Sequence, residues 1–193
     1  MNFIEIGSND YDTFLTSPYF TKNSWGIIAE PVKKYFDNLP RKENVVYLNQ
    51  ALTSHHDGEM KFYQPIENPS PEWVKSIGSL YPNHPTLEEL GIRDQTFEST
   101  VQTISLSTLY DLIPLNKIHF LKLDTEGNDF DILSNWDFDR FQPMHVQFES
   151  KLMSKEQLAT ICEILHNNKY IVSEGGKKDY SQRCYNHVAV LEV

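Results

Sequence analysis

The chain has 193 residues, and its 27 acidic against 17 basic side chains give a formal charge of -10. This length suits one domain with a buried core, and the negative charge disfavours nucleic acid or an anionic membrane as a partner. Cys162 and Cys184 have neither a metal-ligand nor a disulfide-framework spacing, and without a signal-peptide pattern or an apolar run of about 20 residues we expect a reducing cytoplasm.

Strand-like and helix-like patterns alternate along most of the chain, which predicts a doubly wound α/β fold with a mostly parallel sheet. Strands are expected at residues 2–6, 25–29 and 45–48. A short helix should end near Pro18, and another should begin at Pro31. Within residues 51–63, the turn signal Asp57-Gly58 predicts a β-hairpin.

Residues 65–100 hold five prolines and no sustained periodicity. Long loops in compact domains are often functional, so within a single domain, 1–193, we expect an irregular insertion or substrate lid here. Trp73, Tyr81 and His84 are its candidates for contacting a substrate, because aromatic rings stack on the apolar faces of sugars. Simple packing within the loop is the alternative.

Regular patterns return after this stretch. Residues 101–112 read as a strand followed by a helical turn, and residues 119–123 and 144–148 read as strands. A helix should follow the capping-box pattern that begins at Ser154. Strands at residues 170–173 and 187–193 should close the sheet as an antiparallel pair at one edge.

Acidic residues follow four of the predicted strands: Asp10, Glu30, Asp124 and Glu149. Ligands of open α/β sheets bind beyond the carboxyl ends of the strands. A dinucleotide site would offer Gly-x-Gly-x-x-Gly, whereas only Gly7 is present. Carboxylates suit the sulfonium and ammonium of S-adenosylmethionine, and Glu30 stands about twenty residues past the glycine turn, where a carboxylate accepts ribose hydroxyls.

Several stretches occur in the order found in FkbM-type S-adenosylmethionine-dependent methyltransferases: FIEIGSND, IIAEP, NQALTSHHDGEMKFY, SIGSL, TVQTISLSTLYDLI and FLKLDTEGNDFDIL. The chain resembles this family from Phe3 to about Glu149, most specifically in Lys122-x-Asp124-x-Glu126-Gly127. The resemblance implies a Rossmann-like class I methyltransferase fold, whose seven-stranded sheet has an antiparallel last strand. It also implies methyl transfer to oxygen, often on sugars or polyketide-derived molecules.

The chain departs from the family in two ways. Glu5 and Ser8-Asn9 stand where the family commonly has Asp and Ala-Asn, which keeps a carboxylate and an amide in place. The chain also begins at the first strand, without the leading helix that many relatives carry over the cofactor. We therefore expect either a more open site or one domain of a longer polypeptide, in the setting of glycan synthesis.

These features assign residues to the cofactor. Gly7 should allow close approach of the backbone, and Glu30 should accept the ribose hydroxyls. The full set is Glu5, Gly7, Ser8, Asn9, Asp10, Glu30, Pro31, Gln50, Ala51, Leu52 and Asp124. The alternatives are a helix N-cap at Asn9 or Asp10, a solvated acid at Glu30, and core packing of Ala51 and Leu52.

Asp124, Glu126 and Glu149 are the candidates for catalysis, since a carboxylate beside the transferable methyl could hold a hydroxyl or accept its proton. Metal-assisted sugar O-methyltransferases of related fold use acids at similar strand ends, so Asp124 and Glu149 are also candidates for Mg²⁺. A structural acid paired with Lys122 or with a helix terminus is the alternative for Glu149. The SIGSL match places Ser79 near the acceptor.

The sequence therefore predicts an O-methyltransferase that uses S-adenosylmethionine and acts on a hydroxyl of a sugar, glycan or glycosylated metabolite. Two alternatives remain open at this point. One is an NAD-dependent sugar-modifying oxidoreductase or epimerase, against which the missing glycines count. The other is a non-catalytic cofactor-binding module, against which the strand-end acids count.

Overall fold

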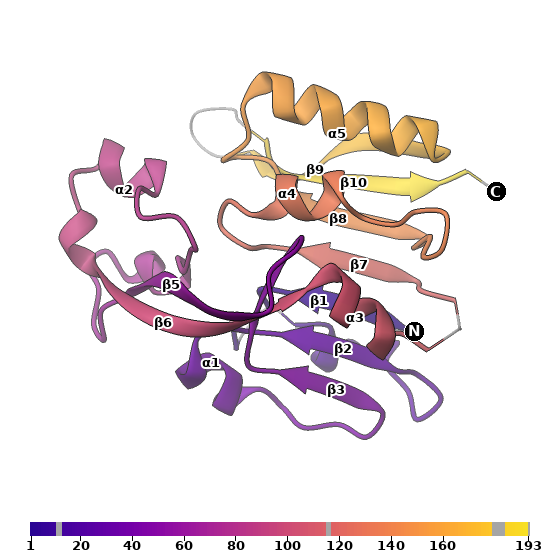
Figure 1. Ribbon diagram of the computed structural model, residues 1–193, viewed down its shortest axis with the longest axis horizontal. Helices are drawn as coiled ribbons and strands as arrows, with labels where there is room; N and C mark the ends of the chain where they lie inside the picture. The colour runs from indigo at the N-terminus through magenta and orange to yellow at the C-terminus, as the bar shows by residue number, and fades with distance from the viewer. Residues whose placement is uncertain (11–12, 115–116, 179–183, 193) are drawn as a thin grey trace.

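The computed structural model describes residues 1–10, 13–114, 117–178 and 184–192, and a seven-stranded sheet lies at its centre (Figure 1). The strand order in this sheet is β3-β2-β1-β7-β8-β10-β9. Its strands are β1 (Phe3–Ile6), β2 (Gly26–Ala29), β3 (Val45–Leu48), β7 (Phe120–Leu123), β8 (His145–Glu149), β9 (Tyr170–Lys178) and β10 (Cys184–Leu191).

The first five of these strands along the chain pair in parallel, whereas β10 runs antiparallel to both β8 and β9. This arrangement confirms the predicted doubly wound sheet with an antiparallel last strand. The end of the strand predicted over 187–193 is not covered, because Val193 lies outside the described residues.

Helices cover both faces of the sheet because the side chains of a strand point alternately to its two sides. Ile4 and Ile6 of β1 belong to the larger core, together with apolar residues of α3 (Leu106–Leu112), α4 (Asp129–Ser134) and α5 (Lys155–Asn167). Phe3 packs in a smaller core on the other face, with Leu15 and Ile28, beside α1 (Lys33–Asn38).

Two predicted helix boundaries, the start at Ser154 and the end near Pro18, can be compared with the structure. The capping box at Ser154 is present, since Ser154 and Gln157 exchange hydrogen bonds between side chain and backbone. Before Pro18, the described residues form only the single 3₁₀ turn η1 (Phe14–Thr16), which the side chain of Thr13 caps, and residues 11–12 lie outside the description.

A second, three-stranded sheet lies beyond the carboxyl ends of the parallel strands (Figure 1). The prediction of a hairpin within residues 51–63 was wrong. β6 (Thr96–Ser105) lies between β4 (Ala51–Thr53) and β5 (Gly58–Pro65), parallel to the former and antiparallel to the latter. Asp57-Gly58 does mark a turn, but Asp57 fastens it to β6 by accepting hydrogen bonds from the backbone and side chain of Ser105.

Residues 66–95 connect β5 to β6 through three short helical segments: η2 (Glu72–Ser76), α2 (Pro85–Glu89) and η3 (Arg93–Gln95). The apolar side chains of Val74, Ile77 and Leu87 in this connection form a small core of their own. Ser79 bonds to the backbone of Tyr63 in both directions, at 2.8 and 3.0 Å, which holds the segment against β5. Its action as a substrate lid stays a prediction. Within the described part of the chain, no helix has the length and apolarity that crossing a bilayer requires.

Candidate functional site

A cleft opens at the carboxyl ends of the parallel strands and holds about 840 Å³ of open space, counting its mouth. Most of the predicted cofactor residues lie in its wall: Gly7, Ser8, Asn9, Glu30, Pro31, Gln50, Ala51, Leu52 and Asp124. The cleft therefore joins segments that are far apart in the sequence but follow neighbouring strands.

Glu30 follows β2 and lines the cleft with only 4% of its surface exposed, so it is not a solvated acid. Its two carboxylate oxygens accept hydrogen bonds from the backbone N–H groups of Asn9 and Val32, both at 2.8 Å. Burial raises the pKa of Glu30 to about 7 against the opposing effect of these bonds, and the charge of Asp10 adds to the rise. A carboxylate oxygen has a second lone pair, so Glu30 can still accept two hydroxyls.

Gly7 has a positive φ of +75°, and a Cβ at this position would lie 1.9 Å from the carbonyl oxygen of Asp124. The residue must therefore be glycine for the loop after β1 to pass the loop after β7. Close approach of the backbone was predicted toward the cofactor. In the structure, the atom nearest to the position of a Cβ at Gly7 is the carbonyl oxygen of Asp124, in the loop after β7.

Two of the predicted cofactor residues lie elsewhere. Glu5 shares a face of β1 with Phe3, away from the cleft, and accepts hydrogen bonds from Thr13 at 2.7 Å and Phe14 at 3.0 Å. The Lys122 ammonium lies 3.3 Å from its carboxylate, in register on β7. Asp10 accepts a hydrogen bond from the side chain of Asn38 near the surface, outside the cleft lining.

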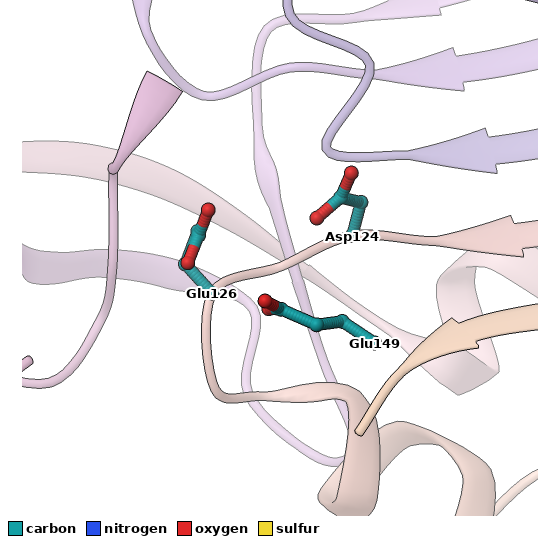
Figure 2. A group of neighbouring side chains, drawn as sticks. All are labelled: Asp124, Glu126 and Glu149. Carbon is teal, nitrogen blue, oxygen red and sulfur yellow. The ribbon is translucent and has the colours of Figure 1, made fainter. Parts of the chain in front are cut away.

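Three carboxylates converge beside the cleft (Figure 2). Asp124 and Glu126 belong to the loop after β7, and Glu149 ends β8. One oxygen of each lies within 4.8 Å of the others. Glu126 also has a positive φ of 51°, a conformation that costs a residue with a side chain about 1 kcal/mol or more. The loop thus directs two acids and the neighbouring strand a third toward one point.

The environment of Glu149 disfavours its charge. Its Oε2 atom is buried and lacks a hydrogen-bond partner in the part of the chain that the structure describes. Burial raises the pKa of Glu149 well above its ordinary value, and the negative charges of Glu126, Asp129 and Asp124 raise it further. A cation placed among these carboxylates would reverse that effect, so the donor set fits a hard divalent ion.

Asp129, which was not among the residues predicted for the site, connects the loop after β7 to the end of β8. It accepts hydrogen bonds from the backbone of Thr125 at 3.0 Å and of Glu149 at 2.9 Å, and from the Thr125 hydroxyl. Burial raises the pKa of Asp129 to about 6. Its place at the start of α4, just after the acidic loop, was the available signal.

None of the four predicted substrate residues is in the cleft lining, but three of them contact the loop after β7. His84 Nε2 lies 2.9 Å from Glu126 Oε2, and the Ser79 hydroxyl donates to the Glu126 carbonyl at 2.7 Å. The Tyr81 hydroxyl reaches Asn128 at 3.2 Å. Trp73 lies outside the cleft lining with 42% of its surface exposed.

Other lining residues were missed because nothing local in the sequence marks them. They come from β1, from α1 and the residue before it, from β5, from both sides of Ser79, and from β7 and the loop that follows it. The SIGSL stretch contained three of them, and one of these is Gly78, whose missing Cβ leaves room for the Phe62 ring. The missed residues are Ile6, Val32, Tyr35, Phe62, Ser76, Gly78, Leu80, Lys122, Thr125 and Asn128.

The strand order, the antiparallel last strand and a cleft at the carboxyl ends define a class I methyltransferase fold. Among solved structures, an O-methyltransferase from Bacillus cereus in complex with SAH matches with a TM-score of 0.50 and 10% identity, over 99% of this chain and 74% of that one. Precorrin-6y C5,15-methyltransferase from Geobacter metallireducens GS-15 matches with a TM-score of 0.46 and 12% identity, over 100% and 80%. Identities this low concern the fold alone.

The family follows from the sequence itself. Residues 5–172 match the family described as the methyltransferase FkbM domain. The chain therefore belongs to the FkbM methyltransferases, which confirms the resemblance found in its motifs. A comparison with curated proteins finds no match.

Proposed function

We propose that this methyltransferase transfers the methyl group of S-adenosylmethionine to a hydroxyl of a sugar, glycan or glycosylated metabolite. One observation carries the proposal: a single cleft has Gly7 and Glu30 in its wall and the carboxylates of Asp124 and Glu126 beside them. Gly7 and Glu30 suit a nucleoside, whereas Asp124 and Glu126 suit the hydroxyl that receives the methyl group. The SAH held by the Bacillus cereus enzyme of similar fold supports the choice of cofactor.

The reaction is an in-line displacement, so the protein mainly has to orient the two reactants. The acceptor oxygen forms a bond to the methyl carbon while the carbon–sulfur bond breaks, which yields a methyl ether and S-adenosylhomocysteine. Asp124 or Glu126 accepts the proton of the hydroxyl. An acidic cleft also attracts the sulfonium and repels phosphate-rich partners, in keeping with an uncharged acceptor.

A divalent cation such as Mg²⁺ belongs to the proposal. Asp124, Glu126 and Glu149 would hold it, and the buried, unpartnered Oε2 of Glu149 supports this assignment. When bound, the cation would polarise the hydroxyl of the acceptor.

Calorimetric titration with S-adenosylhomocysteine tests the cofactor half of the proposal. We expect binding by the native chain and at least about tenfold weaker binding by Glu30→Ala, because the ribose hydroxyls lose their acceptor. Glu67→Ala is the control, since this exposed acid lies outside the cleft lining, and its affinity should not change. Absence of binding by the native chain would exclude the proposal.

Methyl transfer is then measured by mass spectrometry after incubation with S-adenosylmethionine and a panel of mono- and oligosaccharides. A gain of one methyl on a saccharide supports the acceptor class. Transfer to nitrogen-containing acceptors alone would overturn it.

A further inference from the structure

The segment 66–95 contacts the acidic loop through three side chains. Ser79 reaches the backbone of Glu126, and Tyr81 reaches Asn128. His84 contacts a carboxylate of the acidic cluster, with its Nε2 atom 2.9 Å from Glu126 Oε2. The two residues stand 42 positions apart in the sequence.

His84 is buried, with 4% of its surface exposed. Its second ring nitrogen, Nδ1, has no hydrogen-bond partner among the described residues. Burying an imidazole with one nitrogen unsatisfied carries a cost. The polar contact that this side chain makes is therefore through Nε2, to Glu126.

An ionised carboxylate only accepts hydrogen bonds, so the Nε2 atom that faces Glu126 carries the hydrogen. A hydrogen bond to one oxygen restricts the rotation of the carboxylate and leaves the other oxygen for a ligand. Glutamate has several rotatable bonds, and Glu126 stands on a loop rather than on a strand, so an outside restraint is needed to hold it beside Asp124 and Glu149.

We infer that His84 is a positioning residue: its Nε2–H orients Glu126 so that Asp124, Glu126 and Glu149 bind one divalent cation together. This inference rests on the cation in the function proposed above. Hydrogen bonds to metal-binding carboxylates tune affinity in this way. The segment 66–95 then contributes to the site through His84, which orients Glu126 and need not touch the substrate itself.

Three variants separate orientation from packing. His84→Ala removes the donor. His84→Gln keeps an N–H donor, because its amide nitrogen is separated from Cα by as many bonds as Nε2 of histidine. Asn83→Ala is the matched control, since it removes the hydrogen bond that Arg93 donates to Asn83 within the same segment and does not touch Glu126.

The probes are Mn²⁺ and, separately, S-adenosylhomocysteine, each titrated calorimetrically into the full chain after circular dichroism has shown that the variant folds. We expect about tenfold weaker Mn²⁺ binding in His84→Ala, binding within about threefold of the native chain in His84→Gln, and no change in Asn83→Ala. Affinity for S-adenosylhomocysteine should not change in any of them.

The inference is overturned if the native chain binds no Mn²⁺, if His84→Ala binds it as the native chain does, or if folded His84→Gln is as weak as His84→Ala. Failure of the proposed function gives a different result, because the native chain would then not bind S-adenosylhomocysteine, whatever happens with Mn²⁺.

Discussion

Two opposing effects act on the pKa of Glu30. Two backbone N–H groups stabilise its charge, yet burial dominates and raises its pKa to about 7. Hydroxyls donated by a ribose would favour the charged form, and so would lower the pKa of Glu30 in the complex. Cofactor binding should therefore release a proton when it occurs near or below pH 7.

We therefore predict that affinity for S-adenosylhomocysteine rises with pH. At pH 6, one unit below the raised pKa, about a tenth of Glu30 is ionised, so binding should be up to about tenfold weaker than at pH 8. Calorimetry at both values measures the ratio. Glu30→Gln, which cannot ionise, should bind more weakly but with little dependence on pH. An affinity that is flat or falls with pH in the native chain would contradict the assignment.

Glu30 could be predicted because its position depends on local signals, a strand end followed by proline. Glu5 could not be placed correctly by its nearness to Gly7 in the sequence, because the alternation of side chains along β1 turns it to the opposite face. The contact of His84 with Glu126 depends on how an irregular segment folds back, and no pattern in the sequence records that.

The loops that follow two neighbouring strands approach each other at Gly7. β1 and β7 pair in parallel, and the loops that follow them pass so closely that no side chain fits at this glycine. Gly91 provides a comparison, since it has a similar φ of +67° but no atom within 4 Å of its would-be Cβ. The two positions share the backbone conformation and differ in the space around them.

Gly91→Ala should therefore destabilise the fold by about 1–2 kcal/mol, the cost of the left-handed backbone. Gly7→Ala should cost more, because its Cβ would also overlap the Asp124 carbonyl, and the cleft should lose affinity for S-adenosylhomocysteine. Urea denaturation of both variants measures the difference. Equal losses of stability would show that the loops separate easily.

Most elements of the large sheet could be predicted because their strands contain apolar runs, and β1 and β2 are buried along their whole length. The small sheet could not. Asp57-Gly58 predicted a turn correctly, but a hairpin also requires that the flanking strands pair with each other, and β6, which arrives some forty residues later, takes the place between them. Local turn chemistry does not determine which strand becomes the partner.

At the scale of the whole molecule, the parallel topology explains why a local prediction located the site. Parallel strands end at one edge, so the acids at the carboxyl ends of β2, β7 and β8 lie along that edge. The same convergence places several carboxyls away from water. Besides Glu30, burial raises the pKa of Asp129 to about 6 and that of Glu149 well above its ordinary value.

These groups predict how stability depends on pH. Each has a higher pKa in the folded chain than the ordinary value, 4.5 for Glu30 and 3.8 for Asp129, which we take for the unfolded chain. The folded chain therefore retains protons that the unfolded chain has released, and stability falls as pH rises through the interval between the two values. From pH 5.5 to pH 8, Glu30 alone should remove about 2 kcal/mol.

Urea unfolding at several pH values without ligand measures this slope. Glu30→Gln should flatten it, because the amide does not ionise, whereas the same change at the exposed Glu67 should leave it as in the native chain. Mn²⁺ added at pH 8 should restore stability, since a cation bound to the folded chain compensates the charge of the acidic cluster. A native chain that is more stable at pH 8 than at pH 5.5 without ligand would contradict the raised pKa values and, with them, the electrostatic basis of the site.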